Sequence, residues 1–102
     1  MKKRIAVVCG GYSGESVVSM RSAQMIMNNI DRNLYDPTKI VITTTDWYAE
    51  TDAGNIPVNK ANFSISSHGS EIRFDGVFMI IHGTPGENGI LQGYFELLGI
   101  PT

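Results

Sequence analysis

Two apolar runs in this sequence lead directly into glycine-rich turns, and a helical pattern follows each turn. The first run occupies residues 4–9 and meets Gly10-Gly11, and the second occupies residues 77–81 and meets the segment HGTPGENGILQG at residues 82–93. A short run rich in Val and Ile that glycine closes is typical of a strand buried on both faces. The order of strand, tight turn and helix therefore favours an α/β fold, in which such turns lie at the carboxyl ends of the strands.

Both turns are followed by residues with helical periodicity. Residues 15–30 form an amphipathic pattern with Ser13 as the expected N-cap, and the pair Asn28-Asn29 marks the expected end of the helix. A second pattern covers residues 90–98 and ends at Gly99, a glycine in the usual position after a helix. The apolar residues expected on the buried faces are Val18, Met25, Ile26 and Ile30 in the first helix and Ile90, Leu91, Tyr94, Phe95, Leu97 and Leu98 in the second.

The remaining segments complete an expected sheet. Residues 39–45 (KIVITTT) are rich in β-branched side chains and follow a break at residues 35–37, which favours the second strand of a βαβ unit. Residues 46–75 alternate only weakly and predict a hairpin or loop, with Trp47 and Tyr48 at the edge of the core. Strands that alternate with helices predict a three-layer, Rossmann-like α/β domain whose mostly parallel sheet is flanked by helices.

Composition narrows the classes of partner. A length of 102 residues fits one domain. The formal net charge is −2, and three of the eight Lys and Arg residues stand at positions 2–4, so no broad basic face is available for nucleic acid. No run approaches the roughly 20 apolar residues of a membrane span, and no His or Cys pair has the spacing of metal ligands. The single Cys9 lies in an apolar run, which predicts a buried thiol and a reducing, cytoplasmic setting.

The two glycine-rich turns together define a candidate binding site. If the strands at residues 4–9 and 77–81 are neighbours, Glu15 and His82 come to one crevice at the carboxyl edge of the sheet. The first turn and its helix favour an anion, yet the Walker A, G-x-G-x-x-G and G-x-S-x-G patterns are all absent. The pattern alone leaves other roles open, since Glu15 also fits stabilisation of a helix dipole and His82 a hydrogen-bonded strand end. For Ser19 it favours helix capping or a solvated helix surface.

Taken together, the two stretches resemble a known family. GGYSGESVVSMRSA at residues 10–23 and HGTPGENGILQGYFELLGIP at residues 82–101 are similar to the two signature stretches of the N-terminal domain of D-alanine–D-alanine ligases, of the ATP-grasp superfamily. Those stretches have the forms G-G-x-S-x-E-x-x-V-S-x-x-S and H-G-x-x-G-E-[DN]-G-x-x-Q-G-x-[LF]-E, and this sequence fits both at every fixed position. The resemblance covers essentially the whole chain and implies a pre-ATP-grasp domain.

The resemblance implies an enzyme of peptidoglycan synthesis, and so of cell wall biogenesis and cell shape. In this family ATP and Mg²⁺ serve to phosphorylate the carboxylate of one D-alanine, and the amine of a second D-alanine attacks the acyl phosphate. The resemblance implies that Glu15, the catalytic residue of this chain, binds the ammonium of the first D-alanine, and that Val18 lines the pocket for its methyl group. It also implies that His82, with Gly83, helps to position that substrate. Architectural roles are implied for Glu87, Asn88, Gln92, Ser19 and Ser22.

The family places the ATP-holding strands, the magnesium carboxylates and a transition-state arginine in two later domains. Residues 1–102 are therefore expected to be the N-terminal substrate-binding domain of a longer cytoplasmic ligase, inactive alone, in a homodimer that uses this domain in its contact. The sequence departs from the common pattern at Ser16, Asn88 and Thr102. Two alternatives stay open: a ligase that joins D-alanine to D-lactate or D-serine, which would share both stretches, and a stand-alone α/β module that binds a small ligand.

Overall fold

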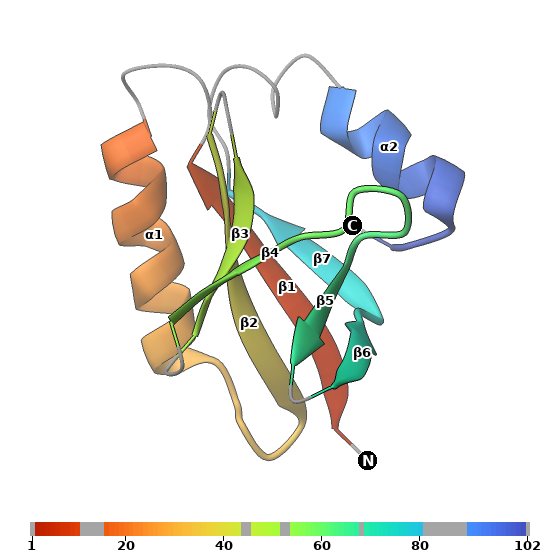
Figure 1. Cartoon of the computed structure of the whole chain (residues 1–102). Coiled ribbons are helices and arrows are strands. Elements are labelled where there is room, and N and C mark those ends of the chain that lie inside the picture. Colours follow the sequence, from red (N-terminus) through yellow and green to blue (C-terminus); the bar gives the residue numbers. More distant parts are fainter. Residues whose placement is uncertain are drawn as a thin grey trace.

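The computed structural model describes residues 2–10, 16–43, 46–51, 54–67, 69–80 and 90–101, with side chains described for all of these except residues 16–18 and 90 (Figure 1). In chain order, the elements within these ranges are β1 (Lys3–Gly10), α1 (Ser16–Asn29), β2 (Tyr35–Ile42), β3 (Trp47–Thr51), β4 (Gly54–Pro57), β5 (Ser64–Ser67), β6 (Ser70–Arg73), β7 (Gly76–Met79) and α2 (Ile90–Leu98).

The main sheet has five strands in the order β4-β3-β2-β1-β7, and it is mixed. β1 runs parallel to both β2 and β7, whereas β2–β3 and β3–β4 are antiparallel pairs. The predicted α/β domain is confirmed, but its sheet is mixed rather than mostly parallel. The reason lies in the short connection after β2, where the Thr43 amide donates to the Asp46 carbonyl over 2.8 Å. A parallel neighbour needs a crossover of roughly a dozen or more residues, so a chain that turns this tightly returns antiparallel.

The described part of residues 46–75 contains two hairpins. β3 and β4 extend the main sheet, and β5 and β6 form a separate two-stranded antiparallel sheet. Of the two predicted alternatives for this region, a hairpin or a loop, the hairpin is confirmed. Ile65 and Ile72 are paired across the second hairpin and pack against the core.

The two helices lie on opposite sides of the main sheet, as Figure 1 shows. Along β1 the side chains alternate between two buried clusters. Ala6 and Val8 belong to the cluster that contains residues of α2, and Val7 and Cys9 belong to the cluster that contains residues of α1. All four residues are fully buried, which confirms the prediction that this strand is buried on both faces.

Aromatic rings fill the core on the α2 side. Between centroids, the Phe63 ring lies 4.8 Å from the Phe95 ring and 6.4 Å from the Trp47 ring. Trp47 is half-buried, as predicted for the edge of the core, and the Lys60 ammonium lies 5.2 Å from its ring centroid. These contacts join β3, the residue before β5 and α2 into one packed layer.

The helix bounds agree with the predicted patterns, but the buried faces differ. Met25 of α1 is 66% exposed and Leu97 of α2 is 89% exposed, although the apolar pattern places both on a buried face. α1 instead buries Ser19 and Ala23, two small residues four positions apart that allow the helix close to β1. Gly99 has a φ of +71° and ends α2 in the left-handed conformation that the prediction required.

Two strands depart from their expected bounds. β2 begins at Tyr35 and includes Pro37. β3 pairs only with the last four residues of β2, so Pro37 has a neighbouring strand on one side only, and a proline is tolerated in such a position. β7 is the outer strand of the described sheet, and its Phe78 is 51% exposed because α1 packs over β1 and β2 instead. β7 is therefore buried on one face rather than on both.

Candidate functional site

The carboxyl ends of β1 and β7 lie side by side at one edge of the main sheet (Figure 1). The two strands are parallel, with Val8 opposite Met79, so residues 11–15 and residues 81–89 both continue the chain from this edge. The adjacency on which the candidate site depends is therefore confirmed. Among the predicted site residues, Glu15, His82 and Gly83 lie outside the described residues, as does the side chain of Val18.

A serine of α1 connects the two strand ends. The Ser19 hydroxyl accepts a hydrogen bond from the Gly10 amide over 3.1 Å and donates one to the Ile80 carbonyl. Ser19 is fully buried. The expectation of a cap or a solvated helix surface is therefore wrong, because the side chain faces the sheet and finds both a donor and an acceptor there. The architectural role that the family resemblance implies for Ser19 agrees with these contacts.

The sequence contains one signal that could have identified this buried serine. Ser19 stands four residues before Ala23, and residues four apart share a face of a helix. Ala23 is also fully buried, so the pair of small residues marks the face that α1 turns toward the sheet. Apolar periodicity alone overlooks this pair, because serine counts as polar and a large residue such as Met25 dominates the pattern.

Gly10 ends β1 in a conformation that a side chain would oppose. Its φ is +96°, and an added Cβ atom would lie 2.4 Å from the carbonyl oxygen of Ile42 on neighbouring β2. Cβ atoms essentially never come within 3.0 Å of another heavy atom, so a side chain here would require the backbone of β2 to move. The glycine predicted for the turn is therefore required at this position by both backbone angle and space.

Both helices begin directly after the segments that leave this edge. α1 starts at Ser16 after residues 11–15, and α2 starts at Ile90 after residues 81–89. The first turn of a helix has unpaired amide groups and a partial positive charge. Such a setting suits the carboxylate of a ligand, whereas a ligand ammonium requires an acidic side chain such as the one predicted at Glu15.

Cys9 lies near this edge but is not suited to react. Its thiol lies 3.5 Å from the Ile40 carbonyl oxygen and 3.6 Å from the Met20 sulfur. Burial raises the pKa of the thiol to about 11, and the positive charge of Lys39 only partly opposes this effect. The thiol is therefore protonated at neutral pH, and the prediction of a buried structural cysteine is confirmed.

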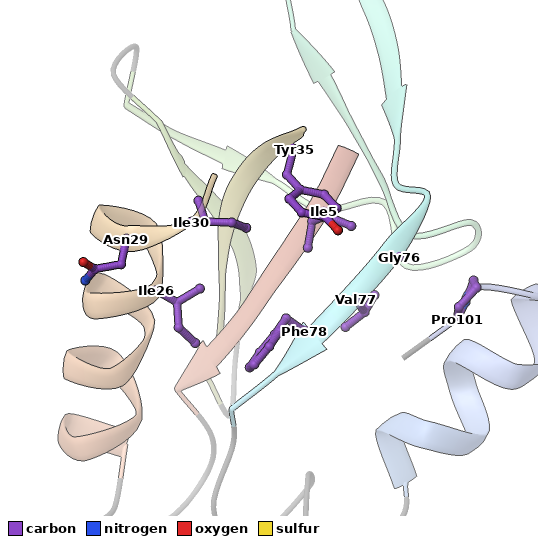
Figure 2. Close-up of a pocket in the computed structure, with 9 residues that line it drawn as sticks. All are labelled: Ile5, Ile26, Asn29, Ile30, Tyr35, Gly76, Val77, Phe78 and Pro101. Atoms are coloured by element: carbon purple, nitrogen blue, oxygen red, sulfur yellow. The ribbon is translucent and has the colours of Figure 1, made fainter. Parts of the chain in front are cut away.

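A hollow of about 520 Å³ lies away from the carboxyl edge, between the C-terminal half of α1 and β7 (Figure 2). Figure 2 shows Ile26 of α1 and Phe78 of β7 both directed into this space. The lining residues are Ile5, Ile26, Asn29, Ile30, Tyr35, Gly76, Val77, Phe78 and Pro101, and none of them is charged. A hollow with this lining offers no ion pair to a zwitterionic amino acid, so it is distinct from the candidate site.

The described residues contain no group of three or more His, Cys, Asp or Glu side chains that could hold a metal ion. In the same part of the chain, neither helix is long and apolar enough to cross a membrane.

Comparison with known proteins assigns the chain to a family. Residues 4–102 match the family model described as "D-ala D-ala ligase N-terminus". The chain is 45% identical over 102 residues to a D-alanine–D-alanine ligase of Christiangramia forsetii, a match that covers 99% of this chain and 31% of the relative. It is 46% identical over 102 residues to a D-alanine–D-alanine ligase of Phocaeicola vulgatus, covering 99% of this chain and 32% of the relative. The chain thus spans about a third of the length of these relatives.

Solved structures of such ligases share the fold. The structure of the D-alanine–D-alanine ligase from Coxiella burnetii matches with a TM-score of 0.86 and 33% identity, over 98% of this chain and 35% of that one. The VanG D-Ala:D-Ser ligase from Enterococcus faecalis matches with a TM-score of 0.84 and 36% identity, over 99% of this chain and 35% of that one. From its sequence and its fold alike, the chain belongs to the family of D-alanine–D-alanine ligase N-terminal domains.

Proposed function

We propose that this chain is the N-terminal substrate-binding domain of a D-alanine–D-alanine ligase, a longer enzyme that makes the D-alanyl-D-alanine dipeptide of peptidoglycan. The observation that carries the proposal is the adjacency of β1 and β7, because both signature stretches then continue from one edge of the sheet. The names of the relatives and the share of their length that this chain covers support the same proposal. An immunoblot of the source cells with an antibody against this domain tests the length, which we expect to be about three times 102 residues.

The proposed site binds the first D-alanine through complementary charges. The Glu15 carboxylate would pair with the ammonium, and the amide groups at the start of the helices would favour the ligand carboxylate. Val18 would line the pocket for the methyl group, and His82 with Gly83 would limit the position of the substrate from the other strand. A substrate held at several points keeps its carboxylate oriented for attack on a phosphoryl group, which is the contribution of positioning to the rate.

The phosphoryl transfer itself is assigned to other parts of the proposed enzyme. Following the family resemblance, we propose that ATP and Mg²⁺ bind to later domains, and no step through them is assigned to this chain. The chain would contribute the orientation of the D-alanine carboxylate that becomes an acyl phosphate, and we expect it to be inactive alone. A cytoplasmic location and a homodimer that uses this domain remain predictions.

Replacement of Glu15 by glutamine in the full-length enzyme tests the proposed site. The change removes the charge but keeps the shape, so we expect KM for the first D-alanine to rise strongly and KM for the second D-alanine to change less. Glu71→Gln is a matched control, because the Glu71 side chain is exposed on β6 and pairs with Arg73. Equal losses at both D-alanine sites would mean that Glu15 acts structurally rather than on the first substrate.

A ligase with a different second substrate is the principal alternative. It is favoured by the match to a D-Ala:D-Ser ligase, which is 36% identical to this chain. Assays of the full-length enzyme with D-alanine, D-serine and D-lactate as acceptors separate these reactions, and we expect D-alanine to have the highest kcat/KM. For a stand-alone binding module, calorimetry of the 102-residue chain with D-alanine would give measurable heat. We expect none, because half of a site binds weakly.

A further inference from the structure

The backbone ladder between β1 and β7 ends in an unusual way at the carboxyl edge. Val8 and Met79 are opposite each other in this parallel pair, and the Ile80 amide donates to the Val8 carbonyl over 2.9 Å. Hydrogen bonds in a parallel ladder are evenly spaced, so the next one would run from the Gly10 amide to the Ile80 carbonyl. These are the two groups that the Ser19 hydroxyl joins.

The Ser19 oxygen therefore occupies the place of the next hydrogen bond in the ladder. It accepts from one strand and donates to the other, so both backbone groups keep a partner while the strands are held further apart than a direct hydrogen bond would allow. The burial of Ser19 and of Gly10 shields this bridge from water. A buried hydroxyl with both partners in place is rigid, because losing either partner leaves a polar group unsatisfied.

We infer that Ser19 is a positioning residue that sets the spacing between the strand ends at Gly10 and Ile80, and thereby the affinity for the first amino acid. The inference rests on the function proposed above. Residues 11–15 begin one position after Gly10, and residues 81–89 begin one position after Ile80, so the bridge fixes the points from which both segments start. Ser19 acts through these backbone groups and not through contact with the substrate.

Removal of the hydroxyl should alter the site without altering the rest of the domain. In Ser19→Ala the two strands either form the direct hydrogen bond and approach each other, or keep their distance with two unsatisfied groups. Both outcomes change the surroundings of Gly10 and Ile80, the last described residues before the two stretches that contain Glu15 and His82. In the full-length enzyme we expect KM for the first D-alanine to rise about tenfold, the effect of about one hydrogen bond. We expect kcat and KM for ATP to stay within about twofold.

Ser22→Ala is the matched control, since Ser22 lies on the same helix and is only partly buried. It should leave all the kinetic constants unchanged. A second variant, Ser19→Cys, keeps a weaker hydrogen-bonding group and should give a KM between those of the wild type and Ser19→Ala. A parallel change in all constants of Ser19→Ala, or an unchanged KM for the first D-alanine, would overturn the inference.

Hydrogen exchange of the unliganded full-length enzyme gives a test that does not depend on activity. In Ser19→Ala, peptides that contain Gly10 or Ile80 should exchange faster, while peptides from β2, β3 and β4 should keep the wild-type rate. Uniformly faster exchange would show that Ser19 only stabilises the domain. If the wild-type enzyme ligates no D-alanine, the proposed function fails, and the exchange pattern still decides whether Ser19 holds the two strand ends.

Discussion

Replacement of Gly10 by alanine tests whether the end of β1 is fixed as the structure describes. Two costs are expected. The φ of +96° is unfavourable for any residue with a side chain, at about 1–3 kcal/mol. The Cβ atom would also lie 2.4 Å from the Ile42 carbonyl oxygen, and overpacking of this kind costs about 1–3 kcal/mol. We therefore expect the free energy of unfolding to fall by about 2–6 kcal/mol, a large part of the roughly 5–15 kcal/mol that stabilises a typical domain.

Gly54→Ala separates the two costs. Gly54 has a φ of +110°, similar to that of Gly10, but no heavy atom lies within 4 Å of an added Cβ. The free energy of unfolding of this control should fall only by the cost of the backbone conformation, about 1–3 kcal/mol. The difference between the two variants then measures the contact with Ile42 directly, because both compare glycine with alanine in the unfolded chain.

Urea unfolding followed by tryptophan fluorescence is a suitable assay. The chain has one tryptophan, and Trp47 lies half-buried against Phe63 and Tyr94, so its emission reports the loss of the core. Equal slopes of free energy against urea concentration would show that both variants unfold from comparable states. If Gly10→Ala lost no more stability than Gly54→Ala, β1 and β2 would not approach as closely as described, and the steric argument would fail.

Three further predictions concern the burial of individual side chains. Burial raises the pKa of the Cys9 thiol to about 11 from an ordinary value of 9.0. As the pH rises, the thiol therefore ionises in the unfolded chain before it ionises in the folded one, and stability should fall between pH 9 and 11. Urea unfolding of Cys9→Ala should show a smaller loss of stability over this pH range. Phe95→Ala should lower the free energy of unfolding by about 3–5 kcal/mol, and Phe78→Ala by less than half as much, because Phe95 is fully buried and Phe78 is 51% exposed. Similar losses of stability for the two variants in thermal or urea unfolding would contradict this. Leu97→Lys should change stability by less than about 0.5 kcal/mol, since Leu97 is 89% exposed, and a larger loss would place it in a contact.

Local pattern predicted the parts of the fold that depend on neighbouring residues. The strand ending at Gly10, the helix ending before Gly99 and the burial of Cys9 all follow from short-range periodicity and glycine chemistry. The antiparallel return of β3 was not predicted, because it depends on a turn of a few residues whose sequence carries no strong hairpin signal. Periodicity also placed Met25 on the wrong face, since it weighs apolar size and not the fit of small side chains against a sheet.

In the candidate site, too, some features could be predicted from the sequence and others could not. Adjacency of the two glycine-rich turns could be expected, because ligand sites in such sheets lie at the carboxyl ends of neighbouring strands. The partner of Ser19 could not be predicted, since its hydroxyl contacts Ile80, which is 61 positions away in the sequence. The roles of Glu15, Val18, His82 and Gly83 come from the family resemblance and stay predictions.

The pairing of β1 with β7 has a consequence for the order of folding. It brings together distant parts of the chain, as the hydrogen bond from the Arg4 amide to the Asp75 carboxylate illustrates across 71 positions. By contrast, β2, β3 and β4 each pair with the strand before them, across shorter separations in the sequence. Closure of a longer loop costs more entropy and proceeds more slowly. During synthesis most of the sheet can therefore assemble while β7 is still inside the ribosome. The edge where the substrate is expected to bind is completed last, after nearly the whole domain has emerged.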